Sequence, residues 1–217
     1  MLTITDLFDL DHTIAKDYLA QFTYPWEALA GIKDFILSVG PTLEGYDEVS
    51  PQVWVHKTAT VAPTAFLGGP CIIGPETEVR HCAFIRGSAL VGAGCVVGNS
   101  VELKNVILFD GVQTPHYNYV GDSILGYKSH MGAGSITSNV KSDKLPVVVR
   151  CGDERIDTGR KKVGAMLGDF VEVGCNSVLN PGTVIGPHSI IYPTSCVRGV
   201  LSERSIYKND GTVLPRK

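Results

Sequence analysis

The sequence of 217 residues has no run of about eighteen apolar residues, and its first residues carry acids instead of a basic stretch followed by an apolar one. It also has no excess of basic side chains, since its formal net charge is −3. The first two absences argue against a transmembrane helix and a signal peptide, so we expect a cytoplasmic protein without a membrane partner. The third argues against a nucleic-acid partner, because nucleic acid would need a concentrated basic face.

The sequence also has no C-x-x-C pair among its six cysteines, which are Cys71, Cys82, Cys95, Cys151, Cys175 and Cys196. In a chain of this length the thiols need not form a disulfide framework. We expect reduced, mostly packed thiols and no structural metal.

What the sequence does contain is a six-residue repeat. Steps of six from Val55 to Leu103 meet an aliphatic residue nine times without a miss, and the series then continues through two slips of five. It is interrupted once and resumes from Leu167 to Val197, so that nineteen of twenty-one positions hold an aliphatic residue or Met. A helix would need a period of about 3.6 residues and a long strand a period of 2, so the repeat indicates neither.

A period of six fits a prism, in which a short strand and a corner form each face and three hexads complete a coil. Twenty-one hexads would make about seven coils, stacked about 4.8 Å apart like the strands of a sheet. This pattern resembles the hexapeptide-repeat left-handed β-helix, and the left hand is implied by the resemblance alone. We therefore predict a mainly β protein, with a left-handed parallel β-helix over residues 51–200 and a tail over residues 201–217.

Residues 1–50 lack the repeat and predict a helical N-terminal cap. Ile14, Tyr18 and Phe22 have helical spacing, while Pro25 and Gly40 suit the start and the end of a second helix. We expect the two helices to cover the first coil, because an open end of stacked strands needs a cover.

Within this region, "FDLDHTI" at residues 8–14 resembles the nucleophile loop of haloacid-dehalogenase-type phosphatases. That chemistry needs a buried strand and a large doubly wound domain around the loop, and neither fits before Val55. A helix N-terminus with acidic residues is the favoured interpretation.

Residues 141–166 interrupt the repeat. Two strand-like runs around "CGDE" predict a hairpin that leaves the prism, and the segment is rich in Lys and Arg. A solvated hairpin is the simplest interpretation, although such excursions in repeat proteins also add binding surface.

The stretch "TPHYNYVGD", residues 114–122, places His116 beside tyrosines in the coils that the two slips flank. Arg86 and Lys104 are eighteen residues apart, so they should lie above one another on one face, with Asn139 near the same stack. Two cations about one strand spacing apart repel unless an anion joins them. The group therefore predicts a site for an anionic ligand.

The segment "GNSVELKN … PHYNYVGDSILGYKSHMGAGSITSNV", residues 98–140, is similar to the acetyltransferase half of the bacterial bifunctional N-acetylglucosamine-1-phosphate uridyltransferases. The resemblance implies N-acetyl transfer from acetyl-CoA to an amino sugar phosphate or nucleotide amino sugar, as in UDP-N-acetylglucosamine biosynthesis. It implies that His116 is the general base that deprotonates the sugar amine, that Glu102 orients it, and that Asn139 lies near the reacting amine.

The same resemblance implies binding positions and an assembly. It places the acceptor's phosphate and sugar at Arg86, Lys104 and Tyr119, and the acetyl-CoA cosubstrate at Ala133 and Cys175. It also implies a homotrimer with active sites between neighbouring subunits.

The chain departs from this family in ways that bear on function. The nucleotidyltransferase domain is absent from the sequence, so we expect no pyrophosphorylase activity. Val140 replaces a tyrosine, His130 stands where an asparagine is usual, and the C-terminal stretch lacks an arginine near the CoA. Acceptor contacts are therefore better retained than CoA contacts.

Two other functions remain open on these residues. A non-catalytic scaffold that binds a sugar phosphate or nucleotide sugar, and partners a separate nucleotidyltransferase, would suit the weaker CoA contacts. The γ-class carbonic anhydrases share the fold but need three metal-binding histidines, two of them close in sequence. The sequence has no H-x4-H spacing, so a zinc hydratase is not favoured.

Overall fold

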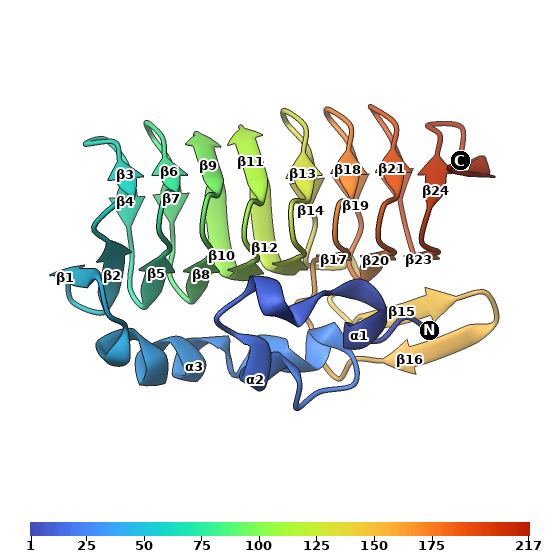
Figure 1. The fold of residues 1–217 in the computed structure, drawn as a ribbon. Coiled ribbons are helices and arrows are strands. Elements are labelled where there is room, and N and C mark those ends of the chain that lie inside the picture. Colours follow the sequence, from blue (N-terminus) through green and yellow to red (C-terminus); the bar gives the residue numbers. More distant parts are fainter.

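The computed structural model describes all 217 residues, and its main body is a parallel β-helix whose coils stack along one axis (Figure 1). The first face consists of β2 (Val53–His56), β5 (Cys71–Ile73), β8 (Ala89–Val91), the ends of β10 (Glu102–Leu108) and β12 (Tyr119–Leu125), β17 (Ala165–Leu167), β20 (Thr183–Ile185) and β23 (Val200–Leu201). The second face consists of β3 (Thr60–Val61), β6 (Glu78–Val79), β9 (Val96–Asn99), β11 (Gln113–His116), β13 (His130–Met131), β18 (Glu172–Val173), β21 (Ile190–Ile191) and β24 (Ser205–Tyr207). The third face consists of β4 (Phe66–Leu67), β7 (Phe84–Ile85), the starts of β10 and β12, β14 (Ile136–Thr137), β19 (Val178–Leu179) and β22 (Cys196–Val197).

The two slips of five are the places where one strand crosses between two faces. The start of β10 pairs with β7 and its end with β8, and β12 likewise pairs with β14 and then with β17. The corner within each strand falls at Asn105 (φ 55°) and Asp122 (φ 49°), and Asn and Asp adopt positive φ more readily than most residues. At each slip the step between inward residues is therefore one residue shorter, and a polar residue, Asn105 or Asp122, forms the corner.

The two repeat positions that are not aliphatic are buried like the others. Thr114 Oγ1 donates to the carbonyl of Val96 (3.2 Å), and Thr137 Oγ1 accepts from the amide of Gly121 (2.9 Å). Because both hydroxyls have partners, the core accepts them without leaving a buried polar group unsatisfied.

The solenoid extends further at its C-terminal end than the repeat predicts. After a step of four from Val197 the series continues at Leu201 and, six residues later, at Tyr207, and β24 pairs in parallel with β21. Residues 201–217 are therefore not a simple tail, because β23, β24 and β25 (Val213–Pro215) all join the sheets. Antiparallel strands cover both ends, β25 on β24 at one and β1 (Tyr46–Ser50) on β2 at the other.

The N-terminal segments lie along the side of the solenoid, not over its first coil (Figure 1). They are α1 (Ile4–Leu7), η1 (Leu10–His12), α2 (Lys16–Leu19), η2 (Pro25–Ala30), α3 (Ile32–Val39) and η3 (Gly40–Thr42). α3 contacts β8 and β10, η2 contacts β12, and η3 contacts β2 of the first coil from the side, so the prediction that the helices cover the first coil is wrong for α3 and η2. None of the helices has both the length and the apolar character needed to cross a membrane.

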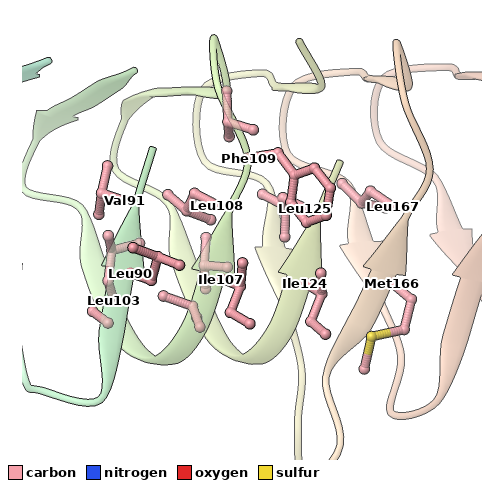
Figure 2. Packing of buried hydrophobic residues seen from close by; sticks show 14 of the residues in the cluster. Leu90, Val91, Leu103, Ile107, Leu108, Phe109, Ile124, Leu125, Met166 and Leu167 are labelled. Carbon is pink, nitrogen blue, oxygen red and sulfur yellow. The ribbon is translucent and has the colours of Figure 1, made fainter. Parts of the chain in front are cut away.

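A second row of apolar side chains explains this position. Strands of the first face carry Leu90, Ile107, Ile124 and Met166 just before the inward residues, and Figure 2 shows the two rows on opposite sides of the strands. All four are at most 1% exposed. Burying each such side chain is worth about 1.5–3 kcal/mol, so covering this face with the helices stabilises the fold.

The excursion, which is the segment 141–166 that interrupts the repeat, contains an antiparallel hairpin. The hairpin consists of β15 (Val148–Cys151) and β16 (Glu154–Asp157) and lies on the same side of the solenoid as the helices (Figure 1). Val147 and Val149 are buried, and the N-terminal amine of Met1 lies 3.0 Å from the carboxylate of Glu154. The hairpin is thus attached to the body and is not free in solvent.

All six cysteines are free, and only Cys71 and Cys95 are buried. The prediction of mostly packed thiols is wrong for Cys82, Cys175 and Cys196, which occupy exposed corner or surface positions. Burial raises the pKa of the Cys71 and Cys95 thiols to about 12.

Candidate active site

His116 ends β11 at the corner between the second and third faces. It pairs with Asn99, and its carbonyl accepts from the amide of Gly134 (3.0 Å) on the next coil. Its side chain is exposed, and the imidazole makes no hydrogen bond within the chain. The ring is therefore available to a bound molecule.

Asn118 fixes the backbone that carries His116. Its side-chain oxygen accepts from the amide of His116 (3.2 Å), while its Nδ2 donates to the carbonyls of Gly132 (2.9 Å) and Ser135 (3.0 Å). Between them, Tyr117 turns the corner at φ 52°. Sequence reasoning missed Asn118, although an inward amide at a position where the hexads place a small residue is a readable signal.

Asp122 is the centre of a polar network on the third face. It is 2% exposed and accepts from Lys104 Nζ (3.0 Å to each oxygen), Asn105 Nδ2 (2.9 Å) and Asn139 Nδ2 (2.6 Å). Asn139 Nδ2 also donates to the hydroxyl of Tyr119 (3.1 Å). The carboxylate was not a predicted site residue, yet it accepts hydrogen bonds from two that were, Lys104 and Asn139.

The network leaves the hydroxyl of Tyr119 poised as a donor. Desolvation is the largest cause of the raised pKa of this phenol, and the hydrogen bond from Asn139 opposes it. The phenol therefore stays protonated well above neutral pH and can donate to an acceptor oxygen.

Arg86 and Lys104 do lie on neighbouring coils of one face, because Ile85 pairs with Leu103 directly before them. Each already has a carboxylate partner: Arg86 Nη1 lies 2.8 Å from Glu102, and Lys104 lies 3.0 Å from Asp122. The hydrogen bond to Glu102 and its charge raise the pKa of Arg86. The repulsion expected between the cations is thus offset inside the chain.

Glu102 has no hydrogen bond to His116 in this structure. Its side chain faces Arg86, and its strand position pairs with Tyr119 on the next coil. The structure therefore brings Glu102 to the predicted acceptor residues and not to the imidazole.

Ala133 and Cys175 occupy the same position as His116 on the following coils, at the corner between the second and third faces. The amide of Gly134 bonds to His116, and the amide of Asn176 bonds to the carbonyl of Ala133 (2.9 Å). Ala133 is half-buried and Cys175 is exposed. This row presents mainly backbone groups and small side chains, a surface along which an extended molecule can lie.

The fold agrees with comparisons to known proteins. The family model for the GMPPB C-terminal domain matches residues 69–191, more than half of the chain, and the chain belongs to that family. The hexapeptide β-helix and the likeness to the acetyltransferase half of the uridyltransferases are confirmed.

Curated relatives carry this region as part of longer chains. "Bifunctional protein GlmU" of Methanococcus maripaludis is 31% identical over 207 residues, which are 93% of this chain and 50% of the relative. The bifunctional sugar-1-phosphate nucleotidylyltransferase/acetyltransferase of Sulfurisphaera tokodaii is 37% identical over 94 residues, 43% of this chain and 23% of the relative. The chain thus spans at most about half the length of these relatives.

A hexapeptide transferase family protein from Anaplasma phagocytophilum is a solved structure with some likeness. It has 15% sequence identity and a TM-score of 0.46, over 76% of this chain and 79% of that one.

Proposed function

We propose that the chain is an acetyl-CoA-dependent N-acetyltransferase whose acceptor is an amino sugar phosphate or a nucleotide amino sugar, as in UDP-N-acetylglucosamine biosynthesis. The observation that carries the proposal is the exposed imidazole of His116, which has no hydrogen-bond partner in the chain and stands at the corner between the second and third faces. The activity of the bifunctional relatives that match the chain supports it.

In this proposal His116 is the general base. The amine attacks the thioester in its neutral form, and an imidazole about 3 Å away can accept one of its protons as the C–N bond forms. The tetrahedral intermediate then expels CoA as the C–S bond breaks, and the departing thiolate can take its proton from His116. Asn118 holds the backbone of His116, so it acts as a positioning residue.

The acceptor lies against the third face. Arg86 and Lys104 hold its phosphate, which must share these cations with Glu102 and Asp122. Tyr119 and Asn139 present a hydroxyl and an amide to the sugar or to the developing oxyanion. Glu102 can orient His116, as the family resemblance implies, only after its carboxylate leaves the Arg86 ion pair.

Acetyl-CoA lies along the row of Ala133 and Cys175, so that its thioester reaches His116. The backbone N–H and C=O groups of this row suit the amide groups of the pantetheine arm. Cys175 contributes by its small size and is not assigned a nucleophilic role.

A homotrimer completes these sites between neighbouring subunits. Phe66 and Phe84 lie in the same row as Glu102 and Tyr119, are 59% and 43% exposed, and have ring centroids 5.6 Å apart. Contiguous exposed apolar surface of this kind suits an interface. Sedimentation at micromolar concentration should give a trimer, and a monomer would contradict the assembly.

A CoA-release assay with acetyl-CoA and a panel of amino sugar phosphates and nucleotide amino sugars tests the activity. His116→Ala should lower kcat about 10²–10⁴-fold, because a positioned general base is typically worth that much. The matched control is His81→Ala, an exposed histidine two coils away in the same row. Full turnover by His116→Ala would show that another group is the base.

The second candidate function is a non-catalytic scaffold that binds a sugar phosphate or nucleotide sugar, and one observation favours it. The network of Lys104, Asp122, Asn139 and Tyr119 is complete without His116. Ligand binding without turnover for any acceptor in the panel would select this function.

A further inference from the structure

The return segment of the excursion, Gly159–Lys162, runs directly beside the Asp122 network. The amide of Val163 donates to the carbonyl of Asn139 (3.0 Å), and the amide of Gly164 donates to the carbonyl of Asp122 (2.7 Å). Backbone bonds therefore hold the segment against the candidate acceptor site.

A hollow opens where this segment, the N-terminal cap and the third face meet. Its walls are Leu29–Ala30, Lys104–Asn105, Asp122 and Gly159–Lys162. Four cationic residues thus line this hollow, and Asp122 is the only acidic residue among its walls.

That carboxylate cannot neutralise the cations of the return segment. Asp122 is already engaged with Lys104, Asn105 and Asn139, and it forms no ion pair with Arg160, Lys161 or Lys162. None of those three side chains has a carboxylate partner anywhere in the chain.

The side chain of Arg160 also lacks a hydrogen-bond partner at one of its nitrogens. Its Nε is buried and has no hydrogen-bond acceptor. A buried donor without an acceptor is costly, and three adjacent cations repel one another unless an anion lies between them.

We propose that this hollow binds a diphosphate group, so that the acceptor is a nucleoside-diphosphate amino sugar and not a sugar monophosphate. The inference rests on the proposed function and names the class of its acceptor. A monophosphate needs little more than Arg86 and Lys104, whereas a diphosphate has more oxygens that can accept hydrogen bonds from the cationic residues lining the hollow, Lys104 and Arg160–Lys162.

Acetyl-CoA also contains a diphosphate, but its proposed path lies elsewhere. The row of Ala133 and Cys175 follows the corner between the second and third faces, whereas the hollow shares Lys104 and Asp122 with the acceptor network. The geometry therefore assigns the diphosphate to the acceptor.

Calorimetric titration of the whole chain with inorganic pyrophosphate and with inorganic phosphate, at one ionic strength, tests the site. Pyrophosphate should bind about tenfold or more tightly than phosphate, as expected for an added charge-assisted hydrogen bond. The double variant Lys161→Ala/Lys162→Ala should lose that preference and keep its affinity for phosphate. The control is Lys33→Ala, which changes an exposed lysine of α3 and should bind both ions like the natural chain.

Equal affinity for the two ions in the natural chain would overturn the inference, as would an unchanged preference in the double variant. A parallel titration with CoA separates the sources, because the double variant should bind CoA normally. Loss of CoA binding equal to the loss of pyrophosphate binding would place the donor in the hollow and refute the assignment.

The outcome is independent of turnover. If no acceptor is acetylated but the pyrophosphate preference depends on Lys161 and Lys162, the diphosphate site stands and the transferase proposal falls. If monophosphates are acetylated and the preference for pyrophosphate is absent, the transferase proposal stands and the diphosphate site falls.

Discussion

Replacing Asp122 by alanine should destabilise the fold strongly, because it removes the acceptor shared by three donors. Asp122 is 2% exposed, and Lys104, only about a quarter exposed, would keep its charge without a partner. Breaking such a buried pair from one side costs about 3–5 kcal/mol. For a chain of this size that corresponds to a fall in Tm of about 6–20 °C.

The measurement is thermal unfolding followed by circular dichroism, with Asp143→Ala as the matched control. Asp143 also pairs with a lysine, Lys141, at 3.0 Å, but its side chain is half exposed, so its replacement should change the Tm little. The double variant Lys104→Ala/Asp122→Ala should be more stable than Asp122→Ala, because no unpaired charge remains. A Tm for Asp122→Ala within the range of the control would refute the reasoning.

Three further predictions concern the fold. Leu90→Ala should lower the free energy of unfolding in urea by about 2–5 kcal/mol, because it leaves a cavity under the helices. Ile14→Ala, at a site 47% exposed, should lower it far less. Equal losses would contradict the packing of the helices on the first face. Burial raises the pKa of the Asp169 carboxyl, so the folded chain holds this proton more tightly than the unfolded chain does. Protonation of Asp169 therefore stabilises the fold at low pH, and this contribution should fall as pH rises from about 3.8 through the raised pKa. The difference in unfolding free energy between the natural chain and Asp169→Asn should follow that fall, and a rise would show the wrong sign. A thiol reagent should leave Cys71 and Cys95 unmodified until the chain unfolds, because both are buried with raised pKa values; rapid modification of either would show that the core opens.

The solenoid was predictable because its repeat states which residue of each hexad points inward. The position of the helices was predicted wrongly, although the apolar residues of the outer row, such as Leu90 and Ile107, recur at about the length of one coil. Reading only the inward position hid this second row, which marks the single face that needs a cover. A search for apolar residues at the spacing of a coil would have found it.

For the candidate site, coil spacing predicted that Arg86 and Lys104 are neighbours, since residues eighteen apart in an unslipped repeat lie one above the other. It could not predict Asp122 as the hub, because the slips change the register there and the corner φ turns its side chain toward Lys104. The contact of Glu102 with Arg86 depends on side-chain geometry that a repeat does not encode. The course of residues 159–162 depends on the path of the excursion, which lies outside the repeat.

Direct detection of the product tests the central claim. With isotopically labelled acetyl-CoA and an amino sugar phosphate or nucleotide amino sugar, mass spectrometry and NMR should show the label in an amide on the sugar nitrogen. The yield should fall about 100-fold or more in His116→Ala and stay unchanged in His81→Ala. Absence of labelled amide from the natural chain with every acceptor, or an undiminished yield from His116→Ala, would contradict the account.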